Sequence, residues 1–310
     1  MIRMPGKSYQ GQLPPLTPVE LEISRNLQRH VQYLAGSIGQ RNIWNPPSMA
    51  TAARYIEKNF ALAGYPVQRQ KHVTYQQETY NLEAELPGHA EPGGGIMVIG
   101  AHYDSVLGSP GANDNASGVA ALLELARLLR QAHLRHTVRF VAFTNEEAPF
   151  YFSDEMGSRL YAKRSRERKE KIRAMISLET VGSYSDQPGS QQYPFPFRYF
   201  YPDAANFVAF VGNTDSRGLV RQSIAAFRRN AGLPSEGLAA PGIIRGVGWS
   251  DHWSFWKSGY QAIMVTDTAF FRYAHYHTEE DTPDRLDYRR MALLVQGLKE
   301  VVAELAGGIP

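Results

Sequence analysis

Acidic and histidine side chains recur in this 310-residue chain directly after runs of apolar residues. His102 follows the apolar run 96–101, and Glu146 and Glu147 follow the run 138–143 within four residues of its end. Because the carboxyl ends of parallel strands lie side by side at one edge of a sheet, we expect these side chains to converge there. Imidazole and carboxylate groups are common metal ligands, so the pattern predicts a metal site.

Three further residues extend this candidate set. Asp114 lies in the loop sequence GANDNASG, Glu179 ends the apolar run 174–178, and His277 lies in the sequence YHTEEDT. A lone acid at the end of a buried strand is costly unless it is paired or bound to a cation. His275 competes for the role of the second histidine, but the Tyr-His-Thr context favours His277. The predicted metal ligands are therefore His102, Asp114, Glu147, Glu179 and His277.

Two acidic residues outside this set suit other roles. His102 and Asp104 form an H-x-D pair, in which a carboxylate can fix the tautomer and direction of a metal-bound imidazole. Adjacent carboxylates at a strand end point in different directions, so Glu147 can bind metal while Glu146 accepts a proton from water. Five ligands exceed the needs of one four-coordinate catalytic zinc ion, but they fit two ions that share a carboxylate. We expect two Zn²⁺ ions, with Mn²⁺ or Co²⁺ as substitutes.

The elements that position these residues follow from the spacing of apolar residues, which predicts a single α/β domain over 1–310 with an extended N-terminal arm over 1–16. The strands 67–75 and 80–86 are expected to form an antiparallel edge, and 234–248 is expected to be a long loop. The other expected strands are 96–101, 138–143, 174–178, 207–212 and 262–266, and the expected helices are 18–34, 48–62, 117–129, 157–173, 216–230, 250–256 and 287–305.

Composition limits the classes of partner. The formal net charge of +3 is too small to argue for nucleic acid or a membrane surface, and the basic run KRSRERKEKIR is interpreted as a solvated helix face. The chain has no cysteine, which excludes disulfides and thiolate metal ligands. No apolar stretch approaches the ~18 residues of a membrane span. We expect a soluble protein, cytoplasmic as given or secreted or periplasmic if a leader was removed, whose oligomeric state is open.

Five motifs together resemble metallopeptidase family M28, the co-catalytic dizinc aminopeptidases, a family that also includes glutamate carboxypeptidases and glutaminyl cyclases. The motifs are GAHYDS, GANDNASG, FTNEE, the strand end at Glu179 and YHTEEDT, and they occur in the family's order over residues 96–282. The resemblance implies a three-layer αβα sandwich whose central mixed, mostly parallel sheet has helices on both faces. It also implies a zinc-dependent exopeptidase that removes N-terminal residues from peptide substrates.

Residue by residue, the resemblance implies a role for each predicted ligand. His102 and Glu179 would bind one zinc ion, Glu147 and His277 would bind the other, and Asp114 would bridge them. It also implies a cis peptide bond directly after Asp114. The well-studied aminopeptidases have Asp at the position of Glu179, so the longer side chain leaves open how the amino group of the substrate is held.

The resemblance assigns the catalytic residues as well. Asp104 orients His102, Glu146 is the general base that takes a proton from the attacking water, and Tyr276 donates a hydrogen bond to the developing oxyanion. The sequence SDH at 250–252 matches a further motif near the active cleft. Aromatic residues within 193–201 and 270–273 are expected to line a pocket for an apolar side chain.

Alternatives to an aminopeptidase stay open at this point. A carboxypeptidase of the same family needs a cation for the terminal carboxylate of the substrate, and Arg245 or Arg272 is available. A glutaminyl cyclase-like transferase is a further alternative, although such cyclases use one zinc ion and lack the first histidine, which His102 supplies here. A binding module with a decayed site should lack ligands, and none is missing. A serine or cysteine hydrolase is excluded because the chain has neither a G-x-S-x-G elbow nor a cysteine.

Overall fold

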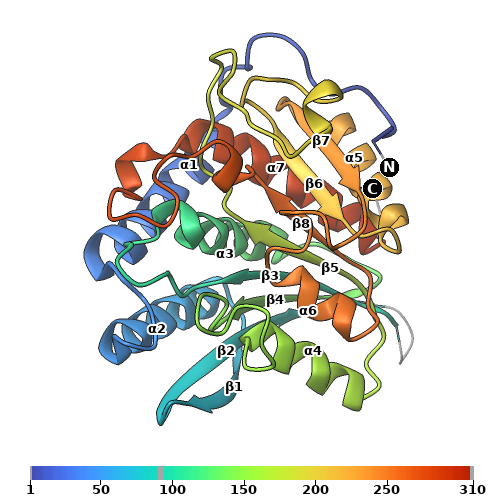
Figure 1. Cartoon of the computed structure of the whole chain (residues 1–310). Coiled ribbons are helices and arrows are strands. Elements are labelled where there is room, and N and C mark those ends of the chain that lie inside the picture. The colour runs from blue at the N-terminus through green and yellow to red at the C-terminus, as the bar shows by residue number, and fades with distance from the viewer. Residues whose placement is uncertain (1, 90–93, 308–310) are drawn as a thin grey trace.

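The computed structural model describes residues 2–89 and 94–307 of the chain. Within these residues, an eight-stranded sheet runs in the order β1-β2-β4-β3-β5-β8-β6-β7 (Figure 1). The strands are β1 (Val67–Thr74), β2 (Gln77–Leu86), β3 (Ile96–His102), β4 (Thr137–Phe143), β5 (Ile172–Glu179), β6 (Val208–Gly212), β7 (Ser235–Ala239) and β8 (Ala262–Thr266).

The middle of this sheet is parallel. Strand β3 pairs in parallel with β4 on one side and with β5 on the other, and β5 pairs in parallel with β8. Their carboxyl ends therefore lie at one edge of the sheet, where open α/β sheets bind ligands. Strands β1 and β2 form the expected antiparallel edge beyond β4, whereas β6 runs antiparallel to β8 and pairs in parallel with β7.

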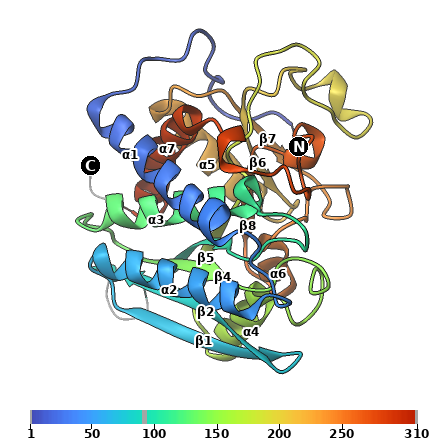
Figure 2. The same ribbon diagram turned by 90° about the vertical axis from the view of Figure 1, so that its left-hand side faces the viewer.

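Helices cover both faces of the sheet, as Figures 1 and 2 show from two sides. Separate groups of buried apolar side chains join the sheet to the helices on each face, so the predicted three-layer α/β fold is confirmed. No helix of the described residues has the length and apolar character needed to span a membrane. One face carries α1 (Pro18–Val31), α2 (Pro46–Leu62), α3 (Gly118–Leu129), α5 (Arg217–Asn230) and α7 (Tyr288–Leu305), and the other carries α4 (Gly157–Glu167) and α6 (His252–Lys257).

Helix α1 begins with a reciprocal pair of capping hydrogen bonds. The hydroxyl of Thr17 accepts from the backbone N–H of Glu20 at 3.3 Å, and the Glu20 carboxylate accepts from the backbone N–H of Thr17 at 2.8 Å. Pro18 takes the first helical position, where no N–H donor is required. These three residues fix where the helix starts, and its apolar face, which includes Leu27, is buried in the large core.

Two expectations about the secondary structure are wrong. Helix α4 ends at Glu167 and does not reach Arg173, because the chain turns at Lys169, whose φ is +57°, and β5 already begins at Ile172. The expected loop 234–248 contains the strand β7. A five-residue edge strand with a central glycine shows too little apolar periodicity to be predicted, and it forms because β6 offers it a parallel partner.

The N-terminal segment 2–16 contains neither helix nor strand and is attached through its backbone. Arg228 donates a hydrogen bond to the carbonyl of Pro5 at 3.2 Å, and Arg289 donates to the carbonyl of Leu13 at 2.9 Å. Because Arg228 lies on α5 and Arg289 on α7, the segment runs over the helices of one outer layer.

His30 makes the stability of the fold depend on pH. It is buried on α1, its Nδ1 lies 2.8 Å from the hydroxyl of Tyr55, and burial lowers its pKa from 6.5 to about 3. Between these two pKa values the unfolded chain binds a proton that the folded protein does not, so stability falls as the pH drops. We expect this residue to lower the free energy of unfolding by up to about 1.4 kcal/mol per pH unit from about pH 6 to pH 4.5.

Urea unfolding of the wild type and of His30→Leu at the two ends of this pH range measures the effect. Because both proteins share every other titrating group, the variant should lose less stability on acidification than the wild type. Equal losses in the two proteins would show that His30 is not held neutral in the folded state.

Candidate metal centre

The predicted ligands lie together at the carboxyl edge of the parallel strands. His102 and Glu179 are the last residues of β3 and β5, and Glu147 lies shortly after the end of β4. Asp114 lies in the loop that leads into α3, and His277 lies in the connection between β8 and α7. The structure therefore brings together five residues that are far apart in the sequence.

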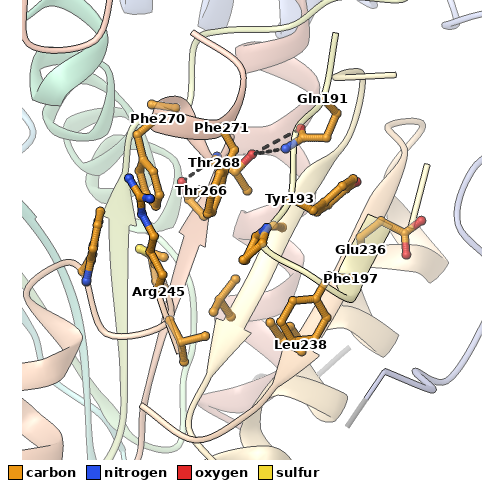
Figure 3. A pocket seen from close by; sticks show the side chains of 18 of the residues that line it. Gln191, Tyr193, Phe197, Glu236, Leu238, Arg245, Thr266, Thr268, Phe270 and Phe271 are labelled. Carbon is orange, nitrogen blue, oxygen red and sulfur yellow. Dashed lines mark hydrogen bonds between the residues drawn. The ribbon is translucent and has the colours of Figure 1, made fainter. Parts of the chain in front are cut away.

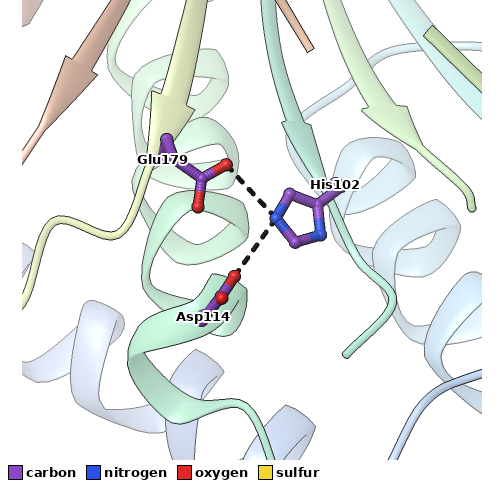
Figure 4. Close-up of side chains that lie close together, drawn as sticks. All are labelled: His102, Asp114 and Glu179. Atoms are coloured by element: carbon purple, nitrogen blue, oxygen red, sulfur yellow. Dashed lines mark ion pairs between the residues drawn. The ribbon is translucent and has the colours of Figure 1, made fainter. Parts of the chain in front are cut away.

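A first group consists of His102, Asp114 and Glu179, whose side chains point toward one another in Figure 4. The Nε2 atom of His102 lies 3.3 Å from Oδ1 of Asp114 and 3.3 Å from Oε2 of Glu179. All three residues are buried, and one ligand atom from each lies within 4.8 Å of the other two. One imidazole nitrogen and two carboxylate oxygens thus surround a common point.

A second group consists of Asp114, Glu147 and His277. The Nε2 atom of His277 lies 3.0 Å from Oδ2 of Asp114 and 3.5 Å from Oε1 of Glu147. Asp114 belongs to both groups and faces each with a different oxygen, an arrangement that suits a carboxylate shared by two neighbouring ions. His275, the competing candidate, belongs to neither of these two groups.

Several ligand atoms have no hydrogen-bond partner within the described part of the chain. Nε2 of His102, Oδ1 of Asp114 and Oε1 of Glu147 are buried and form no hydrogen bond. Buried polar atoms are nearly always hydrogen-bonded, so unpaired ones indicate that a partner such as an ion belongs there. Imidazole nitrogen and carboxylate oxygen are a suitable donor set for Zn²⁺. The residues present therefore fit a metal site.

Burial and neighbouring carboxylates raise the pKa values of three glutamates in the site. Burial raises the pKa of Glu147 to about 7, and Asp114 adds to the rise. Burial also raises the pKa of Glu179 to about 7, opposed by His102 and supported by Asp114. For Glu146, burial raises the pKa well above its usual value, while His102 opposes the rise and Glu179 adds to it. Without a cation, these groups would retain protons near neutral pH.

The same carboxylates also raise the pKa values of the two histidines, against the effect of burial. Burial by itself would lower the pKa of His102, but Glu179 and then Glu146 raise it well above 6.5. Burial likewise opposes protonation of His277, whose pKa is raised to about 10 by Asp114 and Glu147. The cluster therefore favours positive charge at the two places where the histidines meet the carboxylates, which is the charge that metal cations supply.

Asp104 lies behind the ligands and contacts two parts of the site. Its Oδ1 lies 3.5 Å from Nδ1 of His102, and its own backbone carbonyl lies 3.2 Å from the same nitrogen. The carboxylate accepts hydrogen bonds from the backbone N–H groups of Glu146 at 3.2 Å and Glu147 at 3.0 Å. This placement supports the expected orienting role and extends it, because Asp104 also fixes the backbone that carries both glutamates.

Side chains not predicted from the sequence hold the loop that carries Asp114. Asp281 accepts hydrogen bonds from the backbone N–H groups of Asn113 at 2.8 Å and Asp114 at 3.1 Å. Asn115 donates to the carbonyl of Leu178 at 2.9 Å and so ties the loop to the end of β5. The expected cis peptide bond between Asp114 and Asn115 is confirmed. The only signal in the sequence for these supports was their position inside the recognised motifs.

Arg41 is a fully buried cation that supports the loop before Asp114. Its guanidinium donates to the backbone carbonyls of Tyr103 at 2.9 Å, Pro110 at 2.6 Å and Gly111 at 2.9 Å. Burial lowers its pKa to about 10, against the attraction of nearby carboxylates, so it remains charged at neutral pH. No catalytic motif includes this residue, and sequence reasoning gave no signal for it.

The SDH motif contributes to the site through its first residue. Ser250 donates a hydrogen bond to Oε2 of Glu179 at 2.7 Å and thereby orients that carboxylate. Asp251 is fully buried, and burial raises its pKa to about 6. His252 is buried against Trp256 and contacts the carbonyl of Val247 through Nε2 at 2.8 Å, so it stabilises the start of α6.

A pocket whose lining is mostly apolar and aromatic opens next to the metal centre. Figure 3 shows part of this lining. Glu179 and Tyr276 belong to its lining, and the ring of Tyr276 stacks on His277 with centroids 3.8 Å apart. Tyr273, expected here, instead donates a hydrogen bond to Asp281 at 2.9 Å. The expected aromatic residues that do line the pocket are Tyr193, Phe197, Tyr201, Phe270 and Phe271.

The fold and the site together define a metal-dependent hydrolase of the peptidase type. The sequence matches the model of peptidase family M28 over residues 81–302. The chain belongs to this family and is a metallopeptidase whose family acts on peptide substrates.

Relatives with similar sequences agree with this assignment. The uncharacterized protein YfbL of Escherichia coli (strain K12) is 42% identical over 281 residues, which cover 88% of this chain and 85% of YfbL. An aminopeptidase of Pseudomonas aeruginosa (strain UCBPP-PA14) is 42% identical over 112 residues, which cover 36% of this chain and 20% of that longer protein.

Solved structures show the same fold at low sequence identity. BSAP, a zinc aminopeptidase from Bacillus subtilis, is 15% identical with a TM-score of 0.73, covering 96% of each chain. A glutaminyl cyclase from Fimbriiglobus ruber is 20% identical with a TM-score of 0.66, covering 95% of this chain and 97% of the cyclase. The architecture is therefore shared by peptidases and cyclases, and the site must decide between them.

Removing bound metal should destabilise the protein, and more strongly as the pH rises from about 6.5 to about 9. In the metal-free protein Glu147, Glu179 and His277 all have raised pKa values. The folded state therefore binds more protons than the unfolded chain in this range, and stability falls as those protons are lost.

Thermal unfolding of chelator-treated protein at both pH values measures this effect, with added Zn²⁺ as the control that restores stability and hydrolytic activity. A melting temperature that does not change on complete metal removal, or a fully active metal-free protein, would exclude the metal centre.

Proposed function

We propose that this protein is an aminopeptidase that uses two zinc ions to hydrolyse the peptide bond after the N-terminal residue of a peptide. The observation that carries the proposal is the sharing of Asp114 between two groups of ligand atoms, with Glu146 directly beside them. His102 and Glu179 would hold one ion, Glu147 and His277 the other, and Asp114 both. When bound, the ions polarise the carbonyl of the substrate and lower the pKa of water.

Glu146 is the general base in this proposal. It is buried, its Oε2 lies 3.9 Å from Nε2 of His102, and its backbone is fixed by Asp104. It is the one glutamate of the pair that belongs to neither ligand group, so its carboxylate remains available to accept a proton from water and deliver it to the leaving amine. Its position next to His102 of the first ligand group supports this role.

Tyr276 is placed to stabilise the negative charge that develops on the carbonyl oxygen. Its ring packs on His277, and burial together with Asp114 and Glu147 raises its pKa, so its hydroxyl keeps its proton and can donate a hydrogen bond. Preorganised donors of this kind stabilise the transition state more than the ground state. Glu146 and Glu179 supply the negative charge that a free N-terminal ammonium requires.

The pocket beside Glu179 suits a large apolar side chain on the N-terminal residue. The lining includes Phe207, Leu238, Met264 and Phe270, and apolar surface of this kind is what specificity pockets use. Arg245 lies at the rim, where it is exposed and stacks over Trp249 at 5.6 Å. The proposal is therefore that leucine, methionine and aromatic residues are preferred as the N-terminal residue.

One observation favours a second candidate function, a carboxypeptidase. Arg272 is unsuited to binding a terminal carboxylate, because it donates to Gln191 and to the carbonyls of Ser183 and Phe207. Arg245 has no hydrogen bond or ion pair with any described residue and could receive such a group. A glutaminyl cyclase is less well supported, since both ligand groups are complete.

A panel of matched substrates distinguishes these functions. Leucine p-nitroanilide should be hydrolysed by the zinc-loaded protein, while N-acetyl-leucine p-nitroanilide, which lacks the free amine, should not. Carbobenzoxy-glycyl-leucine reports on carboxypeptidase activity, and glutaminyl-alanine reports on cyclisation. Hydrolysis of the blocked dipeptide without release of p-nitroaniline from the first substrate would replace the aminopeptidase with a carboxypeptidase, and cyclisation alone would replace both.

Glu146→Gln is the matched control for the same panel. The substitution keeps the shape of the side chain but removes the base, so we expect the catalytic rate constant to fall by a factor of about 10² to 10⁴ while zinc content is unchanged. Turnover close to that of the wild type would show that another group accepts the proton. Loss of zinc from the variant would instead place Glu146 among the ligands.

A further inference from the structure

Aromatic side chains form an exposed row at the carboxyl edge of the sheet, on the β4 side of the metal centre. The ring centroids of Trp44 and Tyr75 lie 5.6 Å apart, and those of Tyr75 and Phe150 lie 5.9 Å apart. Phe150 shares an apolar cluster with Trp253, whose ring lies 4.8 Å from that of Phe152. We call these five residues the aromatic row. Trp44, Tyr75 and Phe152 are 56%, 61% and 43% exposed, and contiguous apolar surface of this kind marks binding sites.

Hydrogen bonds place the row directly beside the metal centre. The hairpin of β1 and β2, whose turn contains Tyr75, extends past the end of β4 at the carboxyl edge. Thr79 in this projecting part accepts a hydrogen bond at 3.3 Å from the side chain of Asn145, which directly precedes the proposed general base. The backbone N–H of Phe150 donates to the carbonyl of Glu147 at 2.9 Å. The row therefore begins within one turn of a predicted metal ligand.

The backbone at two positions of the row is unfavourable for aromatic residues. Tyr75 has a φ of +47° and Phe152 a φ of +59°, in the left-handed region that disfavours bulky side chains. Tyr75 and Gln76, whose φ is +61°, form the two-residue turn of the hairpin, for which Asn and Gly are the favoured residues. Because Asn or Gly would suit both positions better, the exposed rings point to a role outside the fold.

The row and the apolar pocket lie on opposite sides of the metal centre. Val211 of β6 and Met264 of β8 belong to the lining of the pocket, whereas the row lies beyond β4. Strands β3 and β5, which end at His102 and Glu179, lie between them in the sheet (Figure 1). A peptide whose N-terminal side chain fills the pocket and whose first carbonyl lies at the metal ligands reaches the row with the residues that follow.

We propose that the aromatic row binds the residues that follow the scissile bond of the substrate and favours aromatic and large apolar side chains there. This inference rests on the proposed aminopeptidase function. Aromatic rings offer a large and rigid contact area at a low cost in conformational entropy, and they stack on other aromatic side chains. The row thus recognises the departing peptide, while the pocket recognises the N-terminal residue.

Two peptides that differ only at these positions test the proposal. The zinc-loaded wild type should release leucine from Leu-Phe-Phe-Gly with a kcat/KM about 10-fold higher than from Leu-Gly-Gly-Gly, because only the first peptide carries rings that reach the row. The double substitution Trp44→Ser and Tyr75→Asn should reduce this preference to less than about threefold, because it removes the two most exposed rings. Each single substitution should reduce the preference in part.

Tyr33→Ser is the matched control. Tyr33 is 38% exposed and stacks on Tyr55 with centroids 4.2 Å apart, but it makes no ring contact with the aromatic row. This variant should retain the preference of the wild type. The melting temperature of the double variant should stay close to that of the wild type, since exposed rings are removed and Asn suits the positive φ of the turn.

Equal kcat/KM values for the two peptides in the wild type would overturn the proposal, as would a preference that the double variant retains or that the control loses equally. In native mass spectrometry, a dimer that dissociates only in the double variant would assign the row to contact between subunits instead. Hydrolysis of leucine amide without a preference between the peptides would end this inference alone. Failure to cleave leucine amide and both peptides would end the proposed aminopeptidase function itself.

Discussion

Buried negative charge at the carboxyl edge of the sheet is the constraint on which the site depends. Asp104, Asp114, Glu146, Glu147 and Glu179 are each no more than 8% exposed, and parallel strands bring four of them within reach of one histidine. Carboxylates at this density cannot all be ionised in a low-dielectric environment unless cations accompany them. The unpaired atoms of the two ligand groups mark where those cations belong. The folded protein is therefore most stable when cations occupy the site.

Arg41, Asn115 and Asp281 hold the loop that carries Asp114 in place. Arg41 donates hydrogen bonds to the carbonyls of Tyr103, Pro110 and Gly111, at the two ends of the loop before Asp114. Gly111 has a φ of +61°, with no space for a side chain next to the carbonyl of Asp114. Asn115 and Asp281 connect the same loop to the end of β5 and to the segment that carries His277. Backbone hydrogen bonds thus fix the loop that carries Asp114, independently of the contacts that Asp114 makes with the other ligands.

The structure brings together the ligands that the sequence predicted, but the sequence did not predict the side chains that support them. Candidate ligands at strand ends can be recognised in the sequence, because an acid or histidine directly follows an apolar run. The α/β fold can be predicted from the alternation of such runs with amphipathic helices. The loop expected over 234–248 and the helix end expected at Arg173 were wrong. The edge strand β7 and the left-handed turn at Lys169 depend on neighbouring segments, which local periodicity does not encode. Arg41 could not be found in this way at all. Its importance comes from buried hydrogen bonds to segments that are distant from it in the chain.

Zinc titration of the metal-depleted protein, followed by native mass spectrometry, tests the shared-carboxylate centre most directly. Two zinc ions per chain are expected for the wild type, since two ligand groups meet at Asp114. Asp114→Ala should bind both ions more weakly, because the residue contributes an oxygen to each group. A single ion per chain, or an unchanged affinity for two ions in the variant, would contradict a centre built around this carboxylate.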